Sequence, residues 1–107
     1  EQQNEVFRYD ALIAIENKFT QEIRFYFIEV DISNNKFDKV KLYTKFYQER
    51  LYEKQWWIKY VKRFPGIIVL THRKKGVENK IQEDNYSGLE FKVYGLELVD
   101  EMRNMLK

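Results

Sequence analysis

The chain has 107 residues, a length that predicts one domain with a single core. It has no cysteine and one histidine, which excludes a disulfide scaffold, a cysteine-based zinc site and a thiol nucleophile. Its net charge of +2 is unevenly spread, since residues 36–80 carry thirteen Lys or Arg against four Asp or Glu and both flanks are acidic. No apolar run approaches the ~20 residues of a membrane span, and the polar N-terminus does not read as a signal peptide. We therefore expect a cytoplasmic chain, and the missing initial Met suggests a fragment of a longer protein.

The first two elements are predicted to be strands. Apolar and polar residues alternate from Val6 to Glu16, and Ile23 to Ile32 is rich in β-branched and aromatic residues. A hairpin with the loop 18–21 pairs Asn17 with Glu22. This register places five residues of the first strand on one face with Tyr26, Ile28 and Val30, and we expect that face to lie under a helix. The five are Phe7, Tyr9, Ala11, Ile13 and Ile15.

The middle of the chain predicts a helix and a buried strand. Apolar residues recur at helical spacing over 36–52, with lysines between them. Whether this helix continues through Trp56, Trp57 and Val61 is left open. Phe64-Pro65-Gly66 ends the preceding element, and the apolar run 67–70 is typical of a buried parallel strand.

The last third predicts a loop with a weak helix over 72–84, a strand over 88–94 and a closing helix over 96–106. The closing helix would face inward through Leu96, Val99, Met102 and Met105/Leu106. The element order is β-β-α-β-α-β-α. We therefore expect a single α/β domain with a central four-stranded mixed β-sheet flanked by helices.

Three carboxylates are the most informative residues. The hairpin register sets Asp10 opposite Glu29, with Cβ atoms only ~5 Å apart, and Asp31 shares that face. Like charges this close need a compensating cation, and two carboxylates are a common site for Mg²⁺. Asp10 and Glu29 are therefore the predicted metal ligands. The alternative is a solvated set of carboxylates at the end of a sheet, neutralised by nearby basic residues.

Four short motifs occur together in an order that resembles one known family. They are Tyr9-Asp10-Ala11, the strand end Phe27-Ile28-Glu29-Val30-Asp31, the helix segment 39–47 and the segment 64–71. In this order they resemble the replication-relaxation family of plasmid, phage and conjugative-element proteins. The similarity covers about residues 6–72.

The resemblance implies a restriction-endonuclease-like core, usually preceded by a winged-helix DNA-binding domain. Carried over by position, Asp10 and Glu29 match the metal-binding carboxylates of that fold. Asp31 stands where active nucleases often have a lysine, and Lys39 is the candidate to supply that charge. The predicted catalytic set is thus Asp10, Glu29, Asp31 and Lys39. Tyr9 replaces the usual proline and the 31–39 loop is short, so whether the site still cuts is left open.

The basic block over 36–80 predicts contacts with the phosphate backbone of DNA. The residues expected there are Lys41, Lys45, Arg73, Lys74 and Lys75. A solvated lysine-rich helix is the alternative. Trp56-Trp57 suits base stacking but is more typical of core cover, and His72 is interpreted as a bystander. No glycine pattern of a nucleotide-binding loop occurs, so no nucleotide cofactor is expected.

These observations predict a DNA-associated domain of a plasmid or mobile-element replication or relaxation protein. Its core would be a metal-dependent nuclease core that is degenerate or active, and the sequence leaves these two alternatives open. The alternative is a non-catalytic dimerisation or partner-binding domain of a DNA-binding regulator. DNA and a second copy of the chain are the expected partners, Mg²⁺ is the expected cofactor, and no membrane is involved.

Overall fold

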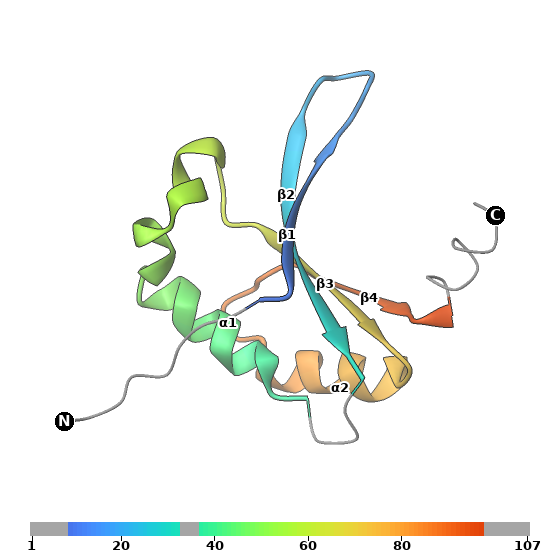
Figure 1. Ribbon diagram of the computed structural model, residues 1–107. Helices are drawn as coiled ribbons and strands as arrows, with labels where there is room; N and C mark the ends of the chain where they lie inside the picture. Colours follow the sequence, from blue (N-terminus) through green and yellow to red (C-terminus); the bar gives the residue numbers. More distant parts are fainter. Residues whose placement is uncertain (1–8, 33–36, 98–107) are drawn as a thin grey trace.

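The computed structural model describes residues 9–32 and 37–97. In chain order its elements are β1 (Ala11–Glu16), β2 (Ile23–Asp31), α1 (Lys39–Gln48), the short 3₁₀ helices η1 (Leu51–Lys54) and η2 (Trp56–Tyr60), β3 (Gly66–Thr71), α2 (Lys74–Asp84) and β4 (Phe91–Gly95). The strands form one mixed sheet in the order β1-β2-β3-β4 (Figure 1). The predicted single α/β domain with a four-stranded mixed sheet is confirmed. No helix among the described residues is long and apolar enough to cross a membrane.

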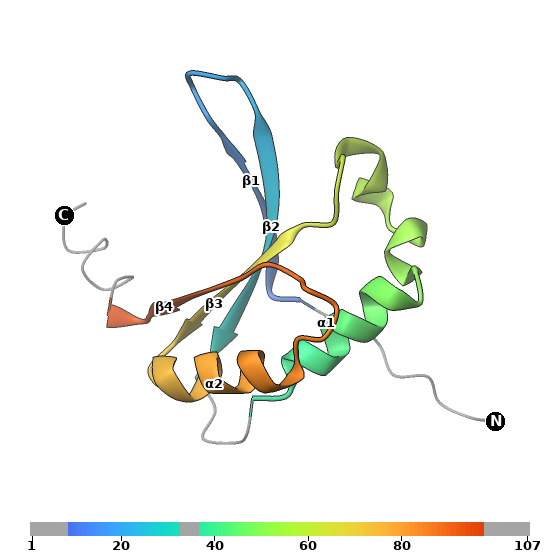
Figure 2. The same ribbon diagram turned by 180° about the vertical axis from the view of Figure 1, so that it is seen from behind.

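The β1–β2 hairpin has the predicted register. The pairing runs from Ala11 opposite Ile28 to Glu16 opposite Ile23. The loop closes where the Asn17 amide donates to the carbonyl oxygen of Glu22 at 2.8 Å. The Asn17 side chain accepts two further loop amides, at 2.9 and 3.2 Å, which explains how four loop residues turn the chain without a glycine. The hairpin projects away from the helices (Figures 1 and 2).

Both described α-helices cover the same face of the sheet. β2, β3 and β4 run parallel, and each crossover moves one place in the same direction across the sheet. Because such crossovers are almost always right-handed, α1 and α2 must lie on one side, as Figures 1 and 2 show. The closing helix predicted over 96–106 lies outside the described residues from position 98 onward.

The face under the helices is not the one that the sequence predicted. Phe27, Ile67 and Val69 are fully buried against α1 and α2. The expected core face is the open one, where Ile13, Ile15 and Val30 are 36%, 48% and 42% exposed. Alternation could not decide between the faces, because β2 is apolar on both of them.

An aromatic cluster fills the core. Phe27 lies at its centre and is surrounded by the rings of Tyr9, Tyr43, Phe46, Trp57 and Phe64 at centroid distances of 4.8 to 6.3 Å. The tryptophan pair is divided, since Trp57 is fully buried and Trp56 is 71% exposed. The core-cover interpretation therefore holds for Trp57 alone.

The helices differ from their predicted bounds. The 36–52 helix is shorter, because α1 ends before Arg50, whose φ of 57° is left-handed, and η1 and η2 follow as separate turns. The weak helix over 72–84 is a regular helix of eleven residues. Its sequence offered little apolar signal because Lys80 and Asp84 take up buried positions as an ion pair with Nζ and Oδ2 3.1 Å apart.

On the open face, Gly66 leaves room for the Tyr26 ring of the neighbouring strand. A Cβ at this position would lie 2.8 Å from carbon atoms of the Tyr26 ring, so only glycine fits beneath it. Arg24 and Lys92 lie over the same ring, each 5.2 Å from its centroid, and Glu90 bonds to Arg24. This cluster covers the middle of the open face with charge.

Candidate functional site

Two of the three predicted carboxylates, Glu29 and Asp31, are buried at the end of β2. Strand β2 directs Glu29 and Asp31 to the helix-covered face, where their exposed fractions are 3% and 9%. They are thus buried acids at the carboxyl end of a parallel strand, a usual place for ligand sites in open α/β sheets. The interpretation of these two as solvated surface carboxylates is wrong.

Asp10 lies beside this strand end. It follows Tyr9 outside β1, one step beyond the last ladder pair, and residues 6–8 of the strand predicted over 6–16 lie outside the described residues. Its amide donates to the carbonyl oxygen of Ile28 at 3.1 Å, and its Oδ2 accepts the amide of Val30 at 2.7 Å. The Asp10 carboxylate therefore bonds to the backbone next to Glu29, and its charge acts on Glu29.

Glu29 is held by two side chains from α1. The Tyr43 hydroxyl donates to Oε1 at 2.6 Å, and the Lys39 Nζ lies 3.9 Å from Oε2. Burial raises the pKa of Glu29 above its usual 4.5; the Tyr43 bond and Lys39 oppose this rise, and Asp10 adds to it. Burial and the neighbouring Glu29 charge raise the pKa of Tyr43 as well, which keeps the phenol protonated as a donor.

Asp31 has a different set of partners. The Thr71 hydroxyl donates to Oδ2 at 2.7 Å, and Arg73 donates through Nε to Oδ2 at 2.8 Å and through its terminal nitrogen to Oδ1 at 3.0 Å. Such a bidentate contact fixes the orientation of both the guanidinium group and the carboxylate. Hydrogen bonding to Asp31 also raises the pKa of Arg73. Arg73, predicted to contact DNA, is therefore engaged with a carboxylate of its own chain.

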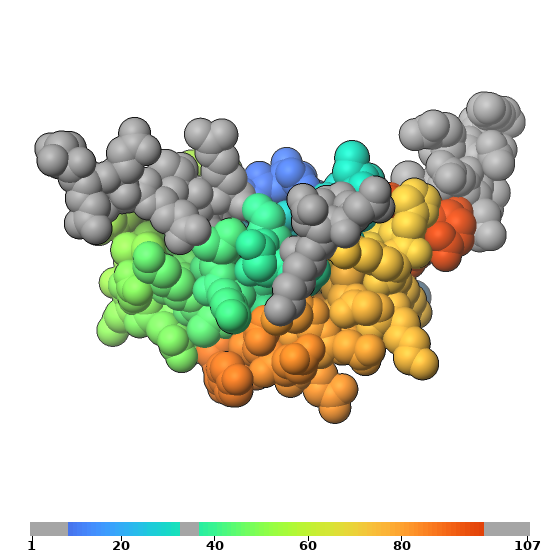
Figure 3. Space-filling model, turned by 90° about the horizontal axis from the view of Figure 1, so that it is seen from below, coloured from blue at the N-terminus to red at the C-terminus, as the bar shows by residue number. Residues whose placement is uncertain are grey.

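The other predicted DNA-binding residues point to solvent. Lys41 and Lys45 are exposed on α1, and Lys74 and Lys75 are exposed in the first turn of α2. None of the four makes an ion pair within residues 9–32 and 37–97. The two helices lie next to each other in the view of Figure 3.

Two residues of the site were missed from the sequence. Tyr43 was counted only as an apolar position of the helix, and Thr71 as the end of a buried strand. The carboxylates that they bind are the signal that identifies them, because a buried acid requires donors.

The three carboxylates do not form one cluster: Asp10 bonds to the Val30 amide, Glu29 contacts Tyr43 and Lys39, and Asp31 pairs with Arg73. In the described part of the chain, no three histidine, cysteine, aspartate or glutamate side chains are placed to hold a metal ion together. The arrangement can offer two carboxylates, Asp10 and Glu29, to a cation that completes its shell with water or phosphate oxygens. The role of these two as metal ligands stays a prediction.

The raised pKa of Glu29 predicts a pH effect on stability. Between its usual 4.5 and the higher folded pKa, the folded state keeps a proton that the unfolded state loses, so Glu29 destabilises the fold as pH rises through that window. Glu29→Gln removes this loss and keeps an oxygen for Tyr43. We expect the free energy of unfolding of Glu29→Gln, measured with urea, to rise relative to wild type as pH increases from 4 to 7.

Glu90→Gln is the control, with the opposite slope. Burial would raise the pKa of Glu90, but bonding and charge from Arg24 and Lys92 lower it overall. The stability that Glu90 contributes is present above its usual pKa of 4.5 and is lost at lower pH. The free energy of unfolding of Glu90→Gln should therefore decrease relative to that of wild type as pH rises. Parallel slopes for the two variants would contradict the assignment.

Comparison with known proteins gives no match: no family model, no curated protein and no solved structure matches this chain.

Proposed function

We propose that the chain is a DNA-associated domain with a restriction-endonuclease-like core, of the kind found in replication or relaxation proteins of plasmids and other mobile elements. The observation that carries this proposal is that Asp10 accepts the amide of Val30, next to the buried Glu29 at the end of β2, with Lys39 on the Glu29 carboxylate. This matches the order of an acid, a second acid and a basic residue that metal-dependent phosphodiester chemistry uses.

In this proposal Asp10 and Glu29 hold a divalent cation such as Mg²⁺. The ion would bind phosphate oxygens and stabilise negative charge on them. The raised pKa of Glu29 supports such a role, because a bound cation would relieve the cost of its buried charge. Lys39 supplies the neighbouring positive charge.

The position of Asp31 favours binding of DNA over cutting. In active nucleases of this fold a lysine stands at that place, whereas here an acid is neutralised by Arg73. A positive charge is therefore present near the expected lysine position, but it is already hydrogen-bonded to a carboxylate. We propose that the exposed lysines of α1 and α2 contact phosphates and that cleavage is weak or lost.

Titration with magnesium tests the metal centre. Wild-type protein should bind Mg²⁺ with millimolar or lower Kd by calorimetry, and Asp10→Ala should lose this binding. Asp38→Ala is the matched control, since Asp38 is an exposed acid beside the start of α1 with no side-chain cap bond. Equal heats from wild type and Asp10→Ala would reject the metal centre. Binding of a labelled duplex to the wild-type protein should also weaken steeply with salt. At low salt Lys41→Glu/Lys45→Glu should bind more weakly than wild type and with a smaller salt dependence, whereas Lys54→Glu should change both less.

One observation favours the alternative of a non-catalytic partner-binding or dimerisation domain. The open sheet face exposes four large apolar or aromatic side chains, those of Ile13, Ile15, Val30 and Tyr94, and no described element covers them. Exposed apolar patches of this kind are typical of protein–protein interfaces. Sedimentation velocity separates the two proposals. A concentration-dependent dimer in a protein that binds neither Mg²⁺ nor duplex DNA would support the alternative.

A further inference from the structure

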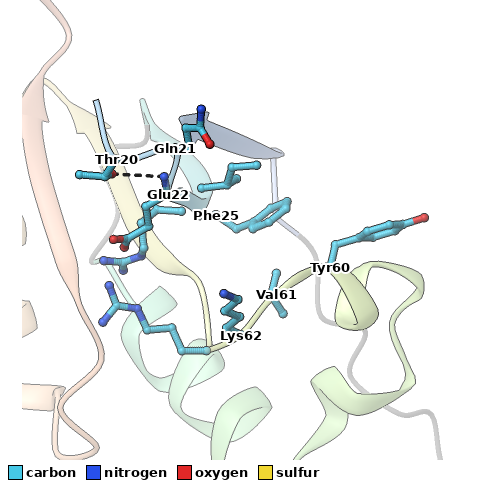
Figure 4. Close-up of a pocket in the computed structure, with 10 residues that line it drawn as sticks. Thr20, Gln21, Glu22, Phe25, Tyr60, Val61 and Lys62 are labelled. Carbon is cyan, nitrogen blue, oxygen red and sulfur yellow. Dashed lines mark hydrogen bonds between the residues drawn. The ribbon is translucent and has the colours of Figure 1, made fainter. Parts of the chain in front are cut away.

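A cleft lies at the opposite end of the sheet from Glu29 and Asp31. It has a volume of ≈ 710 Å³ and is lined by the hairpin residues 20–25 and by residues 60–63, the end of η2 and the chain that follows it. Figure 4 shows the two segments facing each other, with the Phe25 ring and the Lys62 side chain directed into the space between them. Ile23, Arg24 and Phe25 at the start of β2 line this cleft, and about 20 Å of strand, at ~3.3 Å per residue, separate Phe25 from Asp31.

The cleft has unneutralised positive charge. Lys62 and Arg63 are exposed, and neither makes an ion pair with a residue in the described ranges. Arg24 also lines the cleft, although Glu90 bonds to it. Of the ten lining residues shown in Figure 4, Glu22 is the one acid. The cleft is therefore suited to an anion.

Exposed aromatic rings stand beside these cations. Tyr60 is 58% exposed and Trp56 is 71% exposed, with their ring centroids 6.4 Å apart. Lys59 Nζ lies 5.3 Å from the centroid of Tyr60. Neither ring belongs to the hydrophobic core, to which the same segment contributes Trp57 and Phe64 instead.

Cations and exposed rings together select one class of ligand. A phosphate alone would have no use for the rings, and a duplex keeps its bases stacked on one another and out of reach. A single strand offers both repeated phosphates and free base faces, and it binds to basic grooves flanked by aromatic side chains. The volume is also within the range of pockets that enclose small organic groups such as a base.

We propose that this cleft binds single-stranded nucleic acid, with Lys62 and Arg63 on the phosphates and Tyr60 and Trp56 stacked on bases. The proposal rests on the proposed function only in the class of ligand. Its residues are separate from Asp10, Glu29 and the lysines of α1 and α2.

Binding of fluorescein-labelled dT6 at low salt, followed by fluorescence anisotropy, tests the cleft. We expect Tyr60→Ala and Lys62→Glu/Arg63→Glu each to weaken binding about tenfold or more. Arg50→Glu/Lys54→Glu makes the same change in charge at two exposed residues that do not line the cleft and should alter the Kd less than twofold. The isosteric Tyr60→Phe keeps the ring and should bind as wild type does. Thermal melts of every variant show that each is folded.

Tryptophan fluorescence gives a second readout that needs no change in the cleft. Stacking on dT6 should quench the exposed Trp56, and Trp56→Phe should remove that quenching. If wild type fails to bind dT6, if Arg50→Glu/Lys54→Glu weakens binding as much as Lys62→Glu/Arg63→Glu, or if Trp56→Phe still shows the quenching, the cleft proposal is rejected. Loss of Mg²⁺ and duplex binding with retained dT6 binding would reject the proposed function alone.

Discussion

Phe27→Ala is expected to lower the free energy of unfolding by about 3–5 kcal/mol, the largest effect of any single change considered for this chain. Phe27 is fully buried, and five aromatic rings pack around it. Three of these rings, Tyr43, Phe46 and Phe64, are held by further ring contacts and so cannot close on the cavity. A domain of this size has only about 5–15 kcal/mol of stability, so the variant should be close to unfolding.

Urea unfolding followed by circular dichroism measures this effect. Phe19→Ala is the matched control, because Phe19 lies in the hairpin loop and is 98% exposed. It should change the free energy of unfolding by less than about 0.5 kcal/mol. Similar midpoints for the two variants would mean that Phe27 is not the centre of the core.

Arg73→Met is expected to lower the thermal midpoint by roughly 5–10 °C, because it leaves the buried carboxylate of Asp31 without its cation. Asp31 would keep the Thr71 hydroxyl as a donor, but one neutral hydrogen bond does not compensate a buried charge. The aliphatic part of Met keeps much of the packing of the Arg73 stem, so the loss reports on charge.

The double variant Asp31→Asn/Arg73→Met identifies the cause. Removing the acid as well should recover part of the loss, since no buried charge then remains. Arg50→Met is the surface control, because the Arg50–Glu53 pair has side chains 71% and 44% exposed. It should change the midpoint little. A double variant less stable than Arg73→Met would contradict the charge argument.

The hairpin register was predictable from the sequence because one short loop and two alternating strands leave few alternatives. Setting Asn17 opposite Glu22 was enough to bring Asp10 to Glu29 at the end of β2. The resemblance gave Lys39 as the candidate positive charge near these carboxylates, and its Nζ lies 3.9 Å from Glu29 Oε2. The local geometry of the hairpin was therefore enough to predict its register.

The covered face of the sheet could not be predicted in the same way. The choice between Phe27 and Ile28 as inward residues depends on which side the crossover helices take, and that follows from the strand order. Tyr43 and Thr71 were missed for a related reason, because their partners are 14 and 40 residues away in the chain. Helix α2 was underestimated because its buried positions include the Lys80–Asp84 pair.

Strand β1 stands at the margin of the sheet, with β2 as its one neighbour among the described strands. Its first five residues, 11–15, are uncharged and apolar, and Ile13 and Ile15 are more than a third exposed. Such a segment has a free row of backbone donors and acceptors and no lysine or proline to interrupt it, which are the features that template cross-β stacking between molecules. Among the described strands, β1 is therefore the one where pairing with a strand of another molecule is expected first.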